Sequence, residues 1–244
     1  MLSLVIPTYN ERDAIGTLLS RLAAVRRELF EGLEVVIVDD HSTDGTPDIA
    51  EQVLRQRELG TVIRRAGSND LAQAVLDGIR CARGDLIGVM DADLSHPPEL
   101  LSALVEAVRR GSDMAVASRY VQGGGIQHWP WTRRVLSRLG NLMARPLVPV
   151  FDATSGFFVG QAKLLKGLSL NPRGFKILLE ILVQGCVHRV REVPYVFVDR
   201  MTGRSKLNKH VLWLYVVQLV SLYLHRLRHP CPHGGAVAMD EANA

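Results

Sequence analysis

Short apolar runs alternate with amphipathic segments over the first 118 residues, and this alternation limits the possible folds more than any other feature. The apolar runs have the length of strands, and the segments between them carry apolar residues at helical spacing. The expected strands are 2–6, 34–38, 61–64, 86–90 and 113–118. Because parallel strands need right-handed crossovers, the pattern predicts an α/β fold whose mostly parallel sheet is covered by helices on both faces.

The helices between these strands have start signals of their own. Asn10 is expected to cap the first helix, Thr46 to cap the second with Pro47 at its first position, and Asp70 to begin the third. A fourth helix is expected at 98–110. After residue 118 the regular alternation breaks, and the expected elements there are a basic helix after Trp131, a helix at 175–184, and strands at 156–160 and 193–198.

Two carboxylates follow the run 86–90 at the point where it ends. Asp91 and Asp93 are one residue apart, so in an extended segment they point the same way and can bind one cation. Ligands bind at the carboxyl edge of an α/β sheet, and carboxylate oxygens suit Mg²⁺ or Mn²⁺ held together with substrate phosphates. A solvated acidic turn is the alternative, and the buried strand before the pair and Pro97–Pro98 after it favour the site.

The loop after the first strand, 7–11, contains no glycine. Glycine-rich loops hold phosphates with backbone N–H groups, so a nucleotide bound here must be held by side chains. Tyr9 offers a stacking face, and packing against the sheet is an equally good interpretation of this residue. The second strand ends in Asp39–Asp40, and an acid at that place commonly accepts hydrogen bonds from a ribose or base. His41 is interpreted as a bystander.

Charge is distributed unevenly along the chain. Residues 1–118 hold 12 Lys and Arg against 19 Asp and Glu, whereas residues 119–229 hold 17 against 4. The second half therefore predicts an anionic partner. Basic residues interleaved with stacking aromatics, which are typical of nucleic-acid binding, are absent from the sequence. A phosphorylated substrate at an anionic membrane surface fits better than a nucleic acid.

Three cysteines, Cys81, Cys186 and Cys231, lie far apart in the sequence. Their spacing shows neither a disulfide framework nor a metal site, which predicts a reducing cytoplasm. The apolar residues at 1–6 are too few for a signal peptide. The expected location is therefore cytoplasmic and peripheral to the membrane.

The most apolar segment is 211–224, which is short for a membrane span of roughly 20 residues. Basic residues flank it, so 206–228 is expected to form an amphipathic helix at the membrane interface. A helix that closes the core is the alternative. Residues 229–244 are expected to be a disordered tail.

Motifs along almost the whole chain resemble those of the family 2 glycosyltransferases, in particular the dolichol-phosphate mannose synthase-like branch of polyprenyl-phosphate mannosyltransferases. They occur in the order found in that family. The motifs are IPTYNE at 6–11, VDDHSTDGT at 38–46, MDADLSHPPE at 90–99, SRYVQGGG at 118–125, DATSGF at 152–157, GFKILLEIL at 174–182 and EVPYVFVDRMTGRSKL at 192–207. The resemblance implies a GT-A-type domain over 1–205, with a nucleotide-sugar half at 1–118 and an acceptor half at 119–205.

The resemblance also implies roles for individual residues. The expected contacts of the nucleotide sugar are Pro7, Tyr9, Glu11, Val38, Asp40, Asp91, Ala92 and Asp93. The expected metal ligands are Asp91, Asp93 and Ser95, where close relatives carry glutamine in place of the serine. The acceptor phosphate is expected to meet Arg119, Arg133, Arg200 and Lys206. The expected catalytic residues are Asp93, Arg119, Arg200 and Lys206.

The implied reaction is inverting transfer of mannose from GDP-mannose to a polyprenyl (dolichyl-type) phosphate at the cytoplasmic membrane face, with Mg²⁺ or Mn²⁺ as cofactor. A phosphate monoester is largely dianionic at neutral pH, so it needs no general base. Transfer of glucose or another sugar from a UDP-sugar is one alternative. A non-catalytic sugar-nucleotide-binding subunit of a membrane complex is another. The expected partners are the donor, the acceptor lipid and the membrane surface, with a membrane-anchoring subunit left open.

Overall fold

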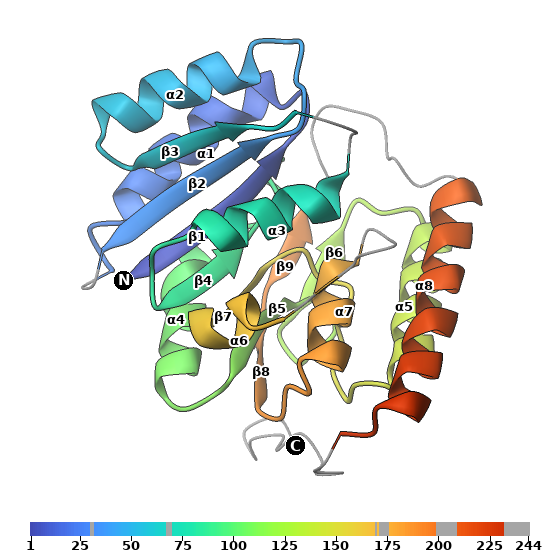
Figure 1. Ribbon diagram of the computed structural model, residues 1–244. Helices are drawn as coiled ribbons and strands as arrows, with labels where there is room; N and C mark the ends of the chain where they lie inside the picture. Colours follow the sequence, from blue (N-terminus) through green and yellow to red (C-terminus); the bar gives the residue numbers. More distant parts are fainter. Residues whose placement is uncertain (30–31, 67–69, 169, 171–175, 199–208, 232–244) are drawn as a thin grey trace.

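A central sheet of seven strands organises the computed structural model, which describes residues 1–29, 32–66, 70–168, 170, 176–198 and 209–231 (Figure 1). The strand order is β3-β2-β1-β4-β7-β5-β8. All neighbours are parallel except β7, which is antiparallel to both β4 and β5. The strands are β1 (Leu2–Thr8), β2 (Leu33–Asp39), β3 (Gly60–Arg64), β4 (Leu86–Val89), β5 (Met114–Ser118), β7 (Phe158–Gln161) and β8 (Val190–Pro194). The prediction of a mostly parallel sheet is confirmed.

Helices cover both faces of this sheet, and alternate residues of a strand face the two layers. In β1, Leu4 and Ile6 pack in the cluster that contains α1, α2 and α4, whereas Val5 packs in the cluster that contains α3, α6 and α7. Every residue of β1 and β2 is buried, as expected for strands covered on both sides. The helices are α1 (Arg12–Val25), α2 (Thr46–Gln56), α3 (Leu71–Cys81), α4 (Leu101–Arg109), α5 (Trp131–Ala144), α6 (Ala162–Lys166), α7 (Ile177–Gln184) and α8 (Lys209–Arg228).

Two of the three predicted helix caps are wrong by one residue. Asn10 does not cap α1, whose N-cap is Glu11. Asn10 instead has a φ of 55° and its side chain accepts a hydrogen bond from the backbone N–H of Thr43, because this loop is tied to the loop after β2. Thr46 is the first residue of α2, after Gly45 with a φ of 87°. Asp70 caps α3 as predicted, accepting hydrogen bonds from two backbone N–H groups.

The predicted strand 193–198 is two strands in two sheets. β8 ends at Pro194, and β9 (Val196–Val198) pairs with β6 (Gly125–Gln127) in a separate two-stranded sheet. Pro194 has no N–H to continue the ladder. Tyr195 joins the two sheets, since its N–H donates to the carbonyl of Ser118 at 3.1 Å and its carbonyl accepts from Gly125 at 3.0 Å.

Helix α8 lies beside α5 (Figure 1). The hydroxyl of Tyr215 donates to the carbonyl of Gly140 at 2.8 Å, and that of Tyr223 donates to the carbonyl of Met143 at 2.8 Å. Leu219 is buried against the core. Among the described residues, no helix combines the length and apolar character needed to cross a bilayer.

Cys186 and Cys231 form a disulfide that joins the end of α7 to the residues after α8. The expectation of no disulfide is therefore wrong. The two cysteines are 45 residues apart in the sequence and are brought together only when α8 returns along the molecule. The argument from cysteine usage to a reducing cytoplasm loses its basis.

Candidate active site

The candidate site lies where β4 ends at the carboxyl edge of the sheet, next to β1. The backbone N–H of Met90 still bonds to the carbonyl of Val5, and the chain then turns away at Asp91. Asp91, Ala92 and Asp93 therefore follow directly from a strand with neighbours on both sides. This is the place in an α/β sheet where ligands bind.

A tight turn holds Asp93 after this strand. Leu94 has a φ of 62°, which is strained for a residue with a branched side chain and is found at functional sites. The turn brings Ser95 back, so that its backbone N–H at 3.0 Å and its hydroxyl both donate to Oδ1 of Asp93. Ser95 therefore lies beside the carboxylate of Asp93, and its predicted role as a metal ligand stays a prediction.

Asp91 is held by different residues. Oδ2 of Asp91 lies 3.2 Å from Nε2 of the buried His96. On the other side Gly156 approaches so closely that a β-carbon there would lie 2.6 Å from the same oxygen. Gly156 precedes β7, and the antiparallel pairing of β7 with β4 brings it beside Asp91.

Arg119 and Asp152 form a buried ion pair at the end of β5. Nε and Nη2 of Arg119 each donate to Asp152 at 2.7 Å, and Nη2 also reaches the hydroxyl of Thr154 at 3.2 Å. Burial alone would lower the pKa of Arg119, but the charge of Asp152 raises it above its ordinary value. The guanidinium is therefore a fixed cation, and its Nη1 makes no hydrogen bond with the described residues.

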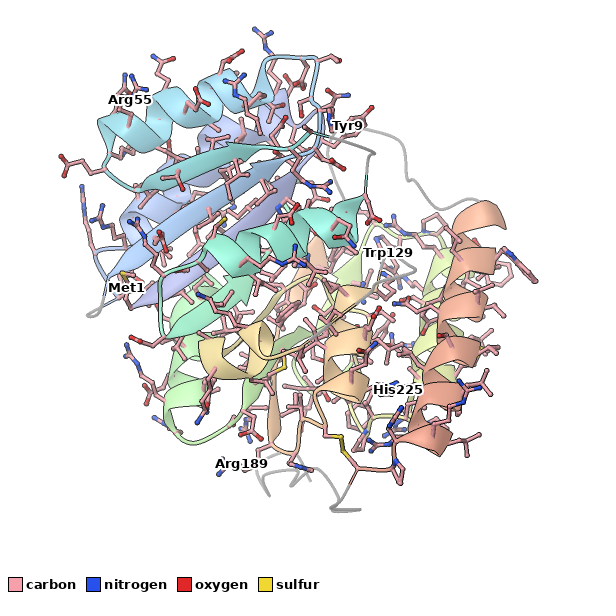
Figure 2. The ribbon with its side chains drawn as sticks, viewed as in Figure 1. Met1, Tyr9, Arg55, Trp129, Arg189 and His225 are labelled. Atoms are coloured by element: carbon pink, nitrogen blue, oxygen red, sulfur yellow. A yellow bond between two sulfur atoms is a disulfide. The ribbon has the colours of Figure 1, made fainter. Side chains whose placement is uncertain are left out.

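Arg133 lies near Arg119, as the shared role predicted for them requires. Its Cζ is 3.9 Å from the centre of the Trp129 ring, and Cζ of Arg119 is 5.5 Å from the same ring. Trp129 is buried, and it packs edge-on against Phe197 with the ring centres 5.2 Å apart. Figure 2 labels Trp129 below Tyr9 in this view. Two cations therefore share one indole.

Lys176 is a further cation that the sequence analysis did not assign. Its Nζ donates to the carbonyl of Thr154 at 3.4 Å. Its pKa is lowered, first because burial disfavours the ammonium and then because Arg119 repels it, while Asp91 and Asp152 act in the opposite direction. Lys176 and Arg119 therefore both contact Thr154, Lys176 through the carbonyl and Arg119 through the hydroxyl.

The predicted nucleotide contacts lie on neighbouring strands at the same edge. Pro7 of β1 pairs in register with Val38 of β2. Tyr9 is 39% exposed, so part of its ring is accessible, and its stacking role stays a prediction. Glu11 follows at the start of α1, where its N–H donates to the hydroxyl of Thr46.

Asp40 also lies at this edge, and it has protein partners. It accepts hydrogen bonds from Nη1 of Arg65 at 2.5 Å and from the backbone N–H of Asp70 at 2.6 Å. Nδ1 of His41 lies 3.4 Å from it. Its role toward the ribose stays a prediction. Arg200 and Lys206 lie outside the described residues.

The residues of the turn fit a divalent cation. Asp91 and Asp93 provide carboxylate oxygens and Ser95 provides a hydroxyl, which are the ligands of Mg²⁺ and Mn²⁺. In the part of the chain that the structure describes, no group of three or more His, Cys, Asp or Glu could hold a metal by itself. Two carboxylates completed by the phosphates of a substrate are a usual arrangement for Mg²⁺.

Some residues of the site carried a signal in the sequence that was not used. His96 lies within the acidic motif, Asp152 and Gly156 within DATSGF, and Lys176 within GFKILLEIL. Except for His96, which lies five residues from Asp91, each of them contacts a residue that is distant in the sequence. Only the folded chain shows what each of them contacts.

Solved structures share this architecture. Glucosyl-3-phosphoglycerate synthase of Mycobacterium tuberculosis superposes with a TM-score of 0.67 and 19% identity, over 96% of this chain and 82% of that one. A mannosyltransferase of Pyrobaculum calidifontis, solved with GDP-Man and Mn²⁺, superposes with a TM-score of 0.65 and 21% identity, over 96% of this chain and 65% of that one. The shared architecture shows that the chain has a GT-A-like fold.

The sequence identifies the family within that fold class. Residues 3–169 match the family described as Glycosyl transferase family 2, and the chain belongs to this family. It is 41% identical over 224 residues to a dolichol-phosphate mannosyltransferase of Pyrococcus furiosus, covering 90% of this chain and 63% of that relative. It is 37% identical over 234 residues to the protein of the same name in Saccharomyces cerevisiae, covering 92% of this chain and 87% of that relative.

Proposed function

We propose that this chain transfers a mannosyl group from GDP-mannose to a polyprenyl (dolichyl-type) phosphate, with inversion at the anomeric carbon. The names of relatives at 41% and 37% identity support the sugar and the lipid. The geometric observation that carries the proposal is that segment 152–156 contacts both groups, since Asp152 pairs with Arg119 at 2.7 Å and Gly156 lies against the carboxylate of Asp91. It joins a carboxylate pair suited to a diphosphate-bound cation to a set of cations suited to a phosphate.

The carboxylates serve the donor in this proposal. Asp91 and Asp93 would hold a divalent cation, with Ser95 keeping Asp93 oriented. When bound, this cation supplies positive charge where the leaving diphosphate becomes more negative.

The cations near Trp129 serve the acceptor. A phosphate monoester has its second pKa at about 6, so at neutral pH it attacks the anomeric carbon as a dianion and needs no general base. Arg119 keeps its orientation through Asp152 and directs its remaining Nη1 donor away from that pair. Arg133, stacked on Trp129, adds a second guanidinium. Arg200 and Lys206 complete the proposed set.

The surface of α5 and α8 suits the lipid tail of this acceptor. On α5, Trp131 is 75% exposed and Leu142 is 60% exposed, and on α8, Trp213 is 64% exposed and Leu227 is 79% exposed. The two helices are held side by side by hydrogen bonds from tyrosine hydroxyls. We propose that this apolar surface, flanked by arginines, rests on the membrane. A cytoplasmic face stays a prediction, since the disulfide removes the argument from cysteine usage.

The proposal is tested by measuring transfer from radiolabelled GDP-mannose and UDP-glucose to polyprenyl phosphate, with free polyprenol as the matched acceptor. We expect transfer only from GDP-mannose and only to the phosphate, and we expect Asp91→Asn and Asp93→Asn to abolish it without unfolding the protein. Transfer from UDP-glucose would replace the sugar assignment. Transfer to the free alcohol would contradict a mechanism without a base, and donor binding without transfer would favour a non-catalytic subunit.

A further inference from the structure

His96 is buried between the metal turn and an aromatic cluster. Its residue is 2% exposed, and its ring lies among the rings of Phe157, Tyr195 and Phe197, with centre-to-centre distances of 5.4, 5.5 and 5.8 Å. These three residues come from the loop before β7, the junction of β8 and β9, and β9 itself. A polar ring enclosed by apolar rings at three places in the fold has its orientation fixed.

The one polar contact of this ring points at the proposed metal site. Nε2 of His96 lies 3.2 Å from Oδ2 of Asp91, and Nδ1 is buried without a hydrogen-bond partner. A carboxylate can only accept a hydrogen bond, so Nε2 must carry the proton. Nε2 of His96 is therefore the donor in this contact, and Oδ2 of Asp91 is the acceptor.

We propose that His96 is a positioning residue that orients the carboxylate of Asp91 for the divalent cation. The inference rests on the proposed function, in which Asp91 is a metal ligand. The hydrogen bond from His96 and the close approach of Gly156 hold Oδ2 from two sides. Hydrogen bonds to a ligating carboxylate fix its orientation, and losing such a partner typically weakens metal binding by about 10–100-fold.

The two carboxylates thus have separate supports. Ser95 holds Asp93 from within the turn, and its backbone and side chain move together with that turn. His96 holds Asp91 from the aromatic cluster, whose rings come from the loop before β7, the junction of β8 and β9, and β9. The proposal can be tested because the hydrogen bond of His96 and the packing of its ring can be changed by different substitutions.

The test measures Mn²⁺ binding to the full-length protein by electron paramagnetic resonance, with and without GDP. His96→Phe keeps an aromatic ring in the cluster and removes the donor, whereas His96→Gln restores an N–H near the position of Nε2. Phe197→Leu loosens the same cluster and leaves the donor in place. We expect His96→Phe to raise the Kd for Mn²⁺ by about 10–100-fold, His96→Gln to recover much of the loss, and Phe197→Leu to have little effect.

Asp91→Asn separates the inference from the function on which it rests. If Asp91→Asn weakens Mn²⁺ binding and His96→Phe does not, the positioning role is wrong and the metal site stands. If Asp91→Asn binds Mn²⁺ as the native protein does, the metal site itself is wrong. If His96→Phe does not fold, His96→Leu, which also lacks the donor, takes its place, and a loss of Mn²⁺ affinity in His96→Leu no greater than that in Phe197→Leu would overturn the inference in favour of packing alone.

Discussion

At the residue scale, the approach of Gly156 to Asp91 places a steric limit on the site. A β-carbon at Gly156 would lie 2.6 Å from Oδ2 of Asp91, which is closer than real contacts allow, and 3.2 Å from Oδ1, which is a tight contact. The neighbour on the other side of the carboxylate is the ring of His96, which is enclosed and has little room to move. Glycine is therefore required here by space and not by backbone conformation.

Gly156→Ala is expected to displace the carboxylate of Asp91 and to reduce mannosyl transfer at least tenfold, with a matching loss of Mn²⁺ affinity. Gly16→Ala in helix α1 is the matched control, since the nearest atom to a β-carbon there is 4.0 Å away, in the side chain of Ile49. That substitution should leave activity unchanged and stabilise the protein by about 0.5–1 kcal/mol. Native activity in Gly156→Ala would show that Asp91 is free to shift without loss.

At the scale of elements, a buried carboxylate joins β1, β2 and the turn before β4. Glu34 of β2 accepts hydrogen bonds from the hydroxyl of Ser3 in β1 and from the backbone N–H and Nε of Arg83, at 3.0 and 2.6 Å. Burial would raise the pKa of Glu34, but the hydrogen bonds from Ser3 and Arg83 together lower it below its ordinary value of 4.5. The ionised form is therefore favoured by the fold.

The sign of this shift predicts a pH dependence of stability. A folded pKa below the unfolded value gives stabilisation that is fully present above pH 4.5 and is lost as the pH falls through the folded pKa. Glu34→Gln should lower the free energy of unfolding by about 2 kcal/mol at pH 7, and its deficit against the native protein should shrink below pH 4. Urea titrations at several pH values measure this, with the exposed Glu106→Gln as control. A constant deficit at all pH values would contradict the assignment.

Helices α5 and α8 each expose a large apolar side chain to solvent, Trp131 and Trp213. Trp131→Ser and Trp213→Ser should each weaken binding to anionic liposomes, measured by flotation, at least tenfold. Each tryptophan side chain contributes apolar area worth about 2 kcal/mol when buried. Leu71→Ser, at an exposed position of α3, is the matched control. Transfer to a short water-soluble prenyl phosphate should survive in all three variants. Undiminished flotation would place membrane contact elsewhere.

At the scale of the whole molecule, the disulfide between Cys186 and Cys231 joins the C-terminal end of α8 to the C-terminal end of α7. The helix is otherwise held by hydrogen bonds to α5, by Gln218 to α7, and by the burial of Leu219 and Leu222. The bond closes a long segment of chain, so its main effect is to restrict the unfolded state.

Reduction or Cys186→Ser is expected to lower the free energy of unfolding by up to about 4 kcal/mol for the separation of 45 residues. Thermal unfolding with and without a reductant measures this effect. Cys81→Ser is the control, since Cys81 is an exposed free thiol. Equal unfolding temperatures of the native protein with and without reductant would mean that the bond contributes nothing to stability.

Sequence and tertiary structure determine different parts of this molecule. Hydrophobic periodicity predicts the first five strands and the helices between them, because buried strands appear as short apolar runs and helices carry apolar residues at helical spacing. The acids at 91 and 93 are predictable for the same reason, since a strand places i and i+2 on one side. The sequence motifs mark Tyr9 and Arg133 as candidate binding residues, but they do not show which side chains lie next to them.

Long-range pairing decided the rest. β7 lies antiparallel between β4 and β5, and no local pattern predicts which strands it joins. The switch of Tyr195 between two sheets, the contact of His96 with Asp91 in its aromatic enclosure, and the ion pair of Arg119 with Asp152 all follow from that arrangement. Periodicity reports which side of an element is apolar, whereas the partner of a buried polar group depends on which elements meet, and only the folded chain fixes that.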